Sequence, residues 1–295
     1  MYHTDLQHVI LLDADAFPLR DPAVLRSLPG YERTGTTFFY DRVINSKVYF
    51  NSQSGGGQYL RRWIQTFDYG KFGLSGPSPS PQLLQSLAYN METCHEMDSS
   101  MVAVDKARAG KAMDVLWYLI TKKRFEYTFS WGDKEAFWLA YEFAHQPYFF
   151  SPWGVSVIES STNKDMERHP ETLCGNMAHF LPVDNGSAPE LLHVNGEALI
   201  EPFPMGVDKM RIASNNQQYN TNPRHVTPRH VRTAVKPTTP PMGAGAPRRF
   251  PSECLVGLGA TPLPPHFHRH LLRRRTFYMG IVTGVITALD TCDLL

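Results

Sequence analysis

The stretch VILLDADAFPLRDP, residues 9–22, joins a short apolar run to two aspartates that are one residue apart. An apolar run cut off by acidic residues is typical of a buried strand, here residues 7–12. Alternate residues of an extended chain point to one side, so Asp13 and Asp15 are expected to direct their carboxylates to the same place. In open α/β sheets ligands bind at such strand ends. The alternative is that both aspartates only cap a turn.

Elements of both kinds alternate along the first two thirds of the chain. Asp21-Pro22 predicts a helix start, and a second strand over Thr34–Tyr40 again ends on an aspartate, Asp41. Helical spacing of apolar residues follows near 60–67, 113–120 and 133–144, with a shorter helix near 82–89. Further strands are expected near 101–104, 155–158, 177–181 and 191–194. This alternation predicts an α/β fold.

The composition excludes some classes of function and marks off the end of the chain. The formal net charge is +1, but residues 221–295 hold nine Arg and one Lys against three acids, which leaves the remainder acidic. An acidic body argues against nucleic acid as a partner. Ten prolines also lie in 221–295, so residues 214–295 are expected to form a largely disordered tail behind a domain spanning 1–213.

The four cysteines lie far apart and show no Cys-x-x-Cys spacing, which makes a zinc or redox motif improbable. One disulfide, such as Cys94 to Cys174, is compatible with the sequence. The best apolar run, 276–289, is shorter than the roughly 20 residues that cross a bilayer.

Four ordered blocks resemble one known family. LLDADAFPLRDPAVL (11–25), YERTGTTFFYDR (31–42), DSSMVAVDKARAGKAMDVLWYL (98–119) and WGDKEAFWLAYEFAHQPYFFSPWGV (131–155) are similar to the fungal and oomycete α-mannosyltransferases of glycosyltransferase family 71. The type members of this family add α-1,3-linked mannose, and the resemblance extends from about residue 7 to about 206. It implies a GT-A-like fold, a GDP-mannose donor, a mannose-containing glycan acceptor, a requirement for Mn²⁺ or Mg²⁺, and retention of the α configuration.

The resemblance also assigns expected roles. Asp13 and Asp15 match the family's Asp-x-Asp motif, in which the carboxylates hold the metal and one of them contacts the nucleotide. Asp98, Ser99 and Ser100 are expected to face the donor sugar, although Asp98 alone is equally explained by a turn. Asp133 is expected to orient the acceptor hydroxyl.

Two further positions carry alternatives. Lys134 is expected to meet a phosphate of the donor. Asp133 beside it is better explained as a helix N-cap, although one carboxylate can serve both roles. His193 is the candidate third metal ligand, with His179 as its rival. The segment after His193 departs from the pattern of related enzymes, because Glu201-Pro202-Phe203 stands where a basic end is expected.

The same resemblance predicts residues upstream of this sequence. A nucleotide-binding half and an amino-terminal membrane anchor normally precede the Asp-x-Asp strand, so the sequence resembles the carboxyl-terminal part of a Golgi membrane protein with a luminal catalytic domain. The rival hypothesis is a non-catalytic remnant of the family that binds glycan or nucleotide. Such a remnant would use Trp131, Trp138 or Trp153 to bind glycan.

Overall fold

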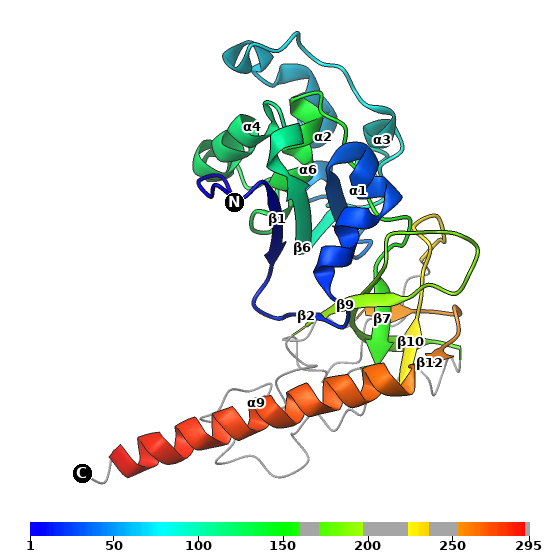
Figure 1. Ribbon diagram of the computed structural model, residues 1–295. Helices are drawn as coiled ribbons and strands as arrows, with labels where there is room; N and C mark the ends of the chain where they lie inside the picture. Colours follow the sequence, from blue (N-terminus) through cyan, green and yellow to red (C-terminus); the bar gives the residue numbers. More distant parts are fainter. Residues whose placement is uncertain (160–170, 197–223, 236–252, 293–295) are drawn as a thin grey trace. The chain divides into compact units, whose positions relative to one another are not determined.

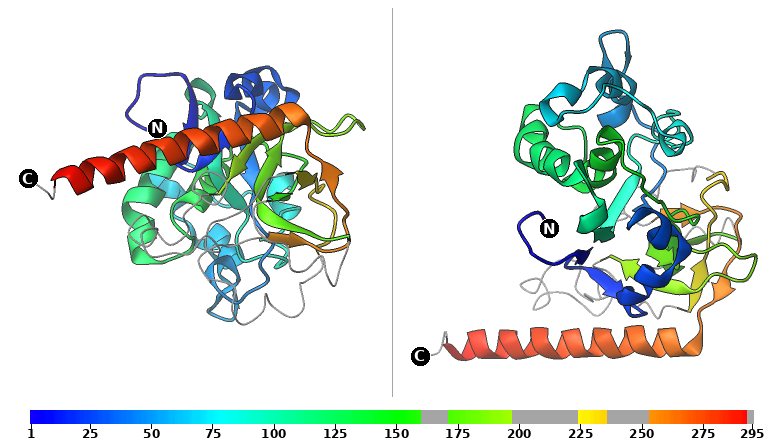
Figure 2. Two further views of the ribbon diagram at one scale, coloured as in Figure 1. Left: turned by 90° about the horizontal axis from the view of Figure 1, so that it is seen from below. Right: turned by 45° about the horizontal axis from the view of Figure 1, so that its top comes forward.

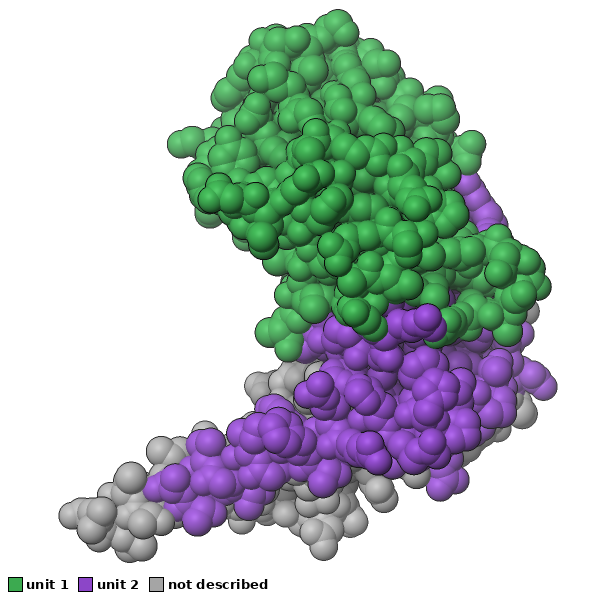
Figure 3. Space-filling model, in the orientation of Figure 1, with its two compact units in different colours: residues 1–14, 21–155, 181–190 green, residues 15–20, 156–180, 191–295 purple. Residues whose placement is uncertain are grey.

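The computed structural model of the chain describes residues 1–159, 171–196, 224–235 and 253–292. These residues belong to two compact units, which are coloured separately in Figure 3. Unit 1 comprises residues 1–14, 21–155 and 181–190, and unit 2 comprises 15–20, 156–180 and 191–295. The boundary between Ala14 and Asp15 therefore assigns the two aspartates of the opening stretch to different units.

Unit 1 is built on a three-stranded antiparallel sheet. Its order is β1 (His8–Leu12), β6 (Met97–Asp105), β3 (Thr36–Tyr40), with the long strand β6 in the middle. All five residues of β3 are buried. Figure 1 shows β1 and β6 running side by side in this unit. A separate short ladder pairs β4 (Gln53–Ser54) with β5 (Gly57–Gln58).

Helix α6 (Lys134–Phe143) is the central helix of unit 1. All ten of its residues are buried, as expected of a helix that is covered on every side. It packs on β6 and on α4 (Ala112–Tyr118). The other helices of this unit are η1 (Pro22–Ser27), α1 (Pro29–Thr34), η2 (Tyr49–Asn51), α2 (Tyr59–Thr66), η3 (Tyr69–Phe72), α3 (Pro81–Leu84), η4 (Lys106–Arg108), η5 (Leu119–Lys123) and α5 (Arg124–Glu126).

Unit 2 contains a seven-stranded antiparallel sheet. Its strands are β2 (Ala16–Pro18), β7 (Ser156–Glu159), β8 (Leu173–Phe180), β9 (Leu191–Asn195), β10 (His225–Thr227), β11 (Glu253–Leu255) and β12 (Thr261–Pro262). The order is β12-β10-β7-β8-β9-β2, and β11 pairs with β8. Val157, Leu173 and Leu255 form a buried apolar cluster on these strands.

The expected α/β character is confirmed, and the paired strands are antiparallel rather than connected as parallel βαβ units. The GT-A fold itself stays a prediction. Asp21 caps η1 as predicted, because its carboxylate accepts the N–H of Ala23 at 2.9 Å. Some boundaries differ. Residues 98–100 lie inside β6 instead of preceding it, the helix expected near 82–89 ends at Leu84, and Thr34 ends α1 instead of beginning a strand.

The described part of the region 214–295 is ordered, in contrast to the predicted disordered tail. It supplies β10, β11, β12 and helix α9 (Pro265–Cys292), the long helix visible in Figure 2. Phe267 and Leu271 near the start of α9 are buried, and the Arg274 guanidinium lies 5.4 Å from the centre of the Phe17 ring. Strands β10 and β11 pair with β7 and β8, which are distant in the sequence, so these segments are buried although their local composition does not predict it. Residues 214–223, 236–252 and 293–295 lie outside the described residues.

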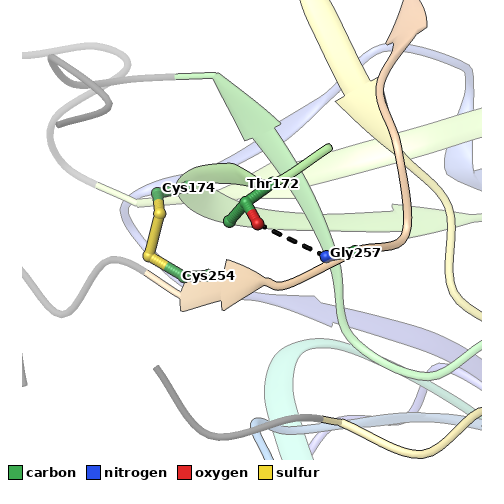
Figure 4. The surroundings of a disulfide bond; sticks show 4 residues. All are labelled: Thr172, Cys174, Cys254 and Gly257. Atoms are coloured by element: carbon green, nitrogen blue, oxygen red, sulfur yellow. Dashed lines mark hydrogen bonds between the residues drawn. A yellow bond between two sulfur atoms is a disulfide. The ribbon is translucent and has the colours of Figure 1, made fainter. Parts of the chain in front are cut away.

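A disulfide links this carboxyl-terminal region to the rest of unit 2. It joins Cys174 on β8 to Cys254 on β11, which pair directly in the sheet. Nearby, the N–H of Gly257 donates to the hydroxyl of Thr172 at 3.3 Å (Figure 4). Cys94 is a free, buried thiol. The suggested bond from Cys94 to Cys174 is therefore wrong, since Cys174 has another partner.

No helix within the described ranges is both long enough and apolar enough to cross a bilayer.

We predict that the disulfide contributes about 2–5 kcal/mol to the stability of unit 2, because it closes a chain separation of 80 residues. Cys254→Ser should lower the free energy of unfolding in urea by this amount. Dithiothreitol should lower the free energy of unfolding of the native chain by the same amount, and it should not change the free energy of unfolding of Cys254→Ser. Cys94→Ala serves as the control that keeps its response to reductant. A native chain that is insensitive to dithiothreitol would contradict the prediction.

Candidate functional site

The structure brings Asp13 next to the segment Asp98–Ser100 in unit 1. Asp13 directly follows β1, and its N–H donates to the carbonyl of Ser100 at 3.0 Å. The antiparallel pairing of Leu12 with Met101 leads to this contact, since it places the end of β1 beside the middle of β6. Asp13 is exposed. The end of β1 and the Asp98 segment of β6 therefore lie beside each other.

Asp98 is fixed by its own strand. It is 5% exposed, and its carboxylate accepts the N–H of Ser100 at 3.1 Å and the hydroxyl of Ser100 at 2.6 Å. These two contacts within β6 set the orientation of the carboxylate. Ser99 is partly exposed.

The pairing between β3 and β6 is irregular at this place. Thr37 pairs with Ala103, but Phe39 pairs with Asp98, so β6 carries extra residues between these two pairs. These extra residues include Ser99 and Ser100. Such bulges redirect side chains and are frequent beside active sites. The irregularity thus coincides with the segment that the sequence singles out for donor binding.

A buried ion pair lies where β3 ends. The carboxylate of Asp41, the residue after β3, accepts a short hydrogen bond from the Lys134 ammonium, and both residues are buried. Arg42 also donates to Asp41 through its side chain, at 3.3 Å. Burial alone would raise the pKa of Asp41, but the charges of Lys134, His95 and Arg42 outweigh it and hold the pKa below its ordinary value. Asp41 is therefore an anion in the fold.

His95 completes this cluster in a defined tautomer. Its Nδ1 lies 3.0 Å from the Lys134 ammonium, which can only donate, so Nδ1 is the acceptor. Its Nε2 therefore carries the hydrogen and donates to the Arg42 carbonyl at 3.1 Å. Burial lowers the pKa of His95 to about 4, and Lys134 contributes to this, although Asp41 opposes it. Lys134 is accordingly engaged by Asp41 and His95, and its predicted contact with a phosphate stays a prediction.

Asp133 occupies the N-cap position of α6 but does not act as a cap. Its backbone has φ −105° and ψ −7°, and its side chain makes no capping hydrogen bond. A capping side chain normally needs an extended backbone at this position. The hydroxyl of Ser130 instead accepts the N–H of Glu135, at 3.4 Å. The structural explanation of Asp133 is therefore wrong, and its predicted role toward an acceptor is untested.

Two buried glutamates fix the start of β6, Glu135 from α6 and Glu96 toward the turn after α3. The carboxylate of Glu135 accepts the N–H groups of Glu96 and Met97, at 2.9 and 3.1 Å, and the indole N–H of Trp138 at 2.5 Å. Glu96 in turn accepts the N–H groups of Leu87 and Ala88. Burial raises the pKa of Glu96 to about 8 and that of Glu135 to about 7. The start of β6, which carries Asp98, is thus fixed from two sides.

Asp15 and His193 both belong to unit 2. The carbonyl of Asp15 accepts the N–H of Gly196 at 3.4 Å, and Pro18 on β2 pairs with His193 on β9. Gly196 has φ +149°, and a side chain there would collide with Asn176. A glycine is therefore required three residues after His193. Because Asp13 belongs to unit 1, the prediction that one ion binds Asp13, Asp15 and His193 stays a prediction.

His193 and its rival His179 lie face to face. They pair in register across β9 and β8, and their ring centres are 4.6 Å apart at an interplanar angle of 23°. Both are buried. Burial holds the pKa of His193 well below its ordinary value, and His179 lowers it further. His193 is therefore a neutral imidazole, which is the form that binds metals.

Known proteins show the same relationship that the four sequence blocks suggest. The family described as "Mannosyltransferase putative" matches residues 3–181, which is more than half of the chain. This chain belongs to that family. The matched range includes Asp13, Asp98, Asp133 and Lys134, and it ends before His193.

Individual relatives are fungal proteins. "Probable alpha-1,3-mannosyltransferase MNT4" of Saccharomyces cerevisiae is 28% identical over 181 residues, which cover 56% of this chain and 28% of the relative. "Alpha-1,3-mannosyltransferase MNT3" of the same yeast is 28% identical over 180 residues, which cover 52% of this chain and 25% of the relative. The matches thus span about a quarter of the length of these relatives.

We predict that the Asp41–Lys134 pair is required for the stability of unit 1. Asp41→Asn should cost about 3–5 kcal/mol in the free energy of unfolding, because it leaves a buried ammonium without its counter-ion. Adding Lys134→Met should restore a large part of this loss. The exposed pair Lys111–Asp114, whose charged atoms are 3.4 Å apart, is the matched control: Asp114→Asn should cost less than about 1 kcal/mol. Equal costs for both substitutions would refute the prediction.

We also predict a pH dependence that is specific to Glu96. Its pKa rises from 4.5 in the unfolded chain to about 8 in the fold, so the folded state holds a proton that the unfolded state has released. The stabilisation is complete below pH 4.5 and is lost as pH rises through the folded pKa. Urea unfolding between pH 6.5 and 8.5 should show falling stability, with a shallower slope for Glu96→Gln. Parallel slopes in the two proteins would disprove this.

Proposed function

We propose that this chain is the catalytic part of a metal-dependent α-mannosyltransferase, which moves mannose from GDP-mannose to a mannose-containing glycan with retention. The observation that supports this most directly is the family match, which covers Asp13, Asp98 and Asp133 and extends to relatives named as α-1,3-mannosyltransferases. The contact between Asp13 and Ser100 adds that two of the candidate segments lie together at one strand end.

The donor groups suit a hard divalent ion. Asp13 offers an exposed carboxylate, Asp15 a second one, and His193 a neutral imidazole. Carboxylate and imidazole ligands are those that Mn²⁺ accepts, and Mg²⁺ binds the carboxylates. When bound, such an ion supplies Lewis-acid neutralisation of the donor diphosphate. These three residues are the ones that would hold it.

The proposed transfer needs positioning more than proton abstraction. The bond between C1 of mannose and the phosphate oxygen breaks, and an acceptor hydroxyl oxygen forms the new bond to C1 on the same face. The acceptor proton passes to the departing phosphate oxygen, and GDP leaves. In this scheme Asp98, with Ser99 and Ser100, holds hydroxyl groups of the donor mannose, and Asp133 orients the acceptor hydroxyl. Lys134 contributes positive charge near the donor phosphates.

We further propose that the catalytic domain acts in the lumen of the Golgi, attached to its membrane. The disulfide between Cys174 and Cys254 supports an oxidising compartment, because such bonds are rare in the reducing cytosol.

The test is a transfer assay with GDP-mannose, Mn²⁺ and α-linked mannobiose, together with calorimetry of GDP binding. The native chain should form a mannotriose with an α linkage, and chelation of the metal should abolish the product. Asp13→Asn should lower kcat at least about a hundredfold, as expected when charge stabilisation of the leaving group is lost. Asp5→Asn, an exposed aspartate eight residues upstream, should leave the rate unchanged.

Each other outcome is decisive against part of the proposal. Binding of mannobiose without metal-dependent GDP binding and without any product would favour the non-catalytic remnant. An absence of both binding and product would overturn the proposal altogether. A β-linked product would contradict retention, and transfer from another nucleotide sugar alone would contradict the donor.

A further inference from the structure

Trp131 differs from the other tryptophans of the described chain in its environment. Its side chain is 72% exposed, whereas Trp63 and Trp138 are buried. The indole N–H of Trp153 donates to the Val183 carbonyl at 2.9 Å. Trp117 is 42% exposed, but its ring stacks on Tyr2 with centres 5.0 Å apart. An indole that is exposed to this degree is a candidate for contact with a ligand, since aromatic rings bind through large apolar faces.

The backbone has positive φ at the aromatic neighbour of Trp131 and at the residue that follows Trp131. Tyr49, whose ring centre is 6.5 Å from that of Trp131, has φ +48°, and Gly132 has φ +75°. A positive φ is sterically unfavourable for a bulky residue such as tyrosine. Outliers of this kind persist where the surrounding fold imposes them, and they concentrate at functional sites. The two rings meet at an interplanar angle of 53°, so they present two inclined apolar faces.

Hydroxyl groups continue this surface. The hydroxyl of Ser52 donates to the Tyr49 carbonyl at 2.6 Å, and it lies 2.5 Å from the hydroxyl of Tyr127. The Tyr127 ring in turn stacks on Tyr59, with centres 4.2 Å apart. Trp131, Tyr49, Ser52 and Tyr127 thus form a connected surface, called here the aromatic surface. None of the four is a lysine, arginine, histidine, aspartate or glutamate, and they offer apolar faces beside polar hydroxyls.

The aromatic surface adjoins the candidate site of unit 1 through the chain itself. Trp131 stands two residues before Asp133 and three before Lys134, whose ammonium pairs with Asp41 at the end of β3. The buried ion pair therefore fixes the turn that carries Trp131 relative to the strand end. Trp131 is therefore close in the chain to Asp133, the residue that the proposed function assigns to the acceptor hydroxyl.

The chemistry of the aromatic surface fits one of the two proposed substrates, the neutral glycan acceptor, better than the other, the donor GDP-mannose. A hexose ring has C–H groups on its faces and hydroxyls at its edge, which match a combination of aromatic faces and hydroxyl donors. GDP-mannose carries a diphosphate and would require cationic groups, which the four residues do not supply. We propose that the aromatic surface binds the terminal mannose of the neutral glycan acceptor. This assignment rests on the proposed function and names the acceptor side of the same site.

The test measures binding rather than turnover. The full chain is titrated with α-linked mannobiose, and affinity is followed by calorimetry and by quenching of tryptophan fluorescence. Trp131→Ala should weaken binding about tenfold or more, the size expected for loss of one aromatic contact. Trp131→Phe should retain part of the affinity, and Trp117→Ala is the matched control, which should bind like the native chain. In the transfer assay, Trp131→Ala should raise KM for mannobiose and leave KM for GDP-mannose unchanged.

Several results would overturn the assignment. These are native affinity in Trp131→Ala, an equal loss in Trp117→Ala, or no binding of mannobiose to the native chain at all. Sedimentation of Trp131→Ala tests another occupant: if this substitution alone abolishes a dimer of the native chain, the surface binds a second copy instead. Because mannobiose binding is measured directly, loss of binding and loss of catalysis are distinguishable.

Discussion

The ion pair between Asp41 and Lys134 is the interaction on which the arrangement of unit 1 depends. It joins the end of β3 to the first residue of α6, two elements that are 93 residues apart in the chain. A buried charge is costly unless it is paired and hydrogen-bonded, so neither residue can leave this position alone. The position of Asp133, the turn of Trp131 and the start of α6 all follow from where Lys134 is held.

Two buried glutamates near this pair also fix elements of unit 1, but through hydrogen bonds from the main chain instead of an ion pair. Glu96 and Glu135 accept main-chain N–H groups and thereby provide partners that a buried segment requires. Together they hold the beginning of β6 against α6 and against the turn after α3. The carboxylate of Asp98 lies just beyond these fixed points. The rigidity of the candidate donor segment is therefore a property of the buried polar groups behind it.

Much of unit 1 was predictable because its signals are local. The apolar run before Asp13, the Asp21-Pro22 helix start and the spacing along α6 each lie within a few residues. The run forms the strand β1, but its residues are half-buried or exposed, so the prediction of a buried strand is wrong. The role of Asp41 was visible only as an acid that ends a strand, the same signal that marks Asp13. Its partner, Lys134, carries no local sign of being buried, because ammonium groups are usually on the surface. For Asp133 the local signal was misleading. Aspartate is a typical N-cap residue, but here its backbone is not extended and its side chain makes no capping hydrogen bond.

Unit 2 was harder to predict, since its sheet is assembled from short segments scattered over the chain. Strands of two or three residues, such as β12 and β10, lack a recognisable period, and the proline-rich composition around them favours disorder.

The covalent bond of Cys174 with Cys254 has a further consequence. The segment between the two cysteines, which includes β9 and β10, is closed into a covalent ring by this bond. A protease that cuts anywhere between the two cysteines therefore leaves a nicked protein that remains one covalent molecule, and the two pieces separate only after reduction.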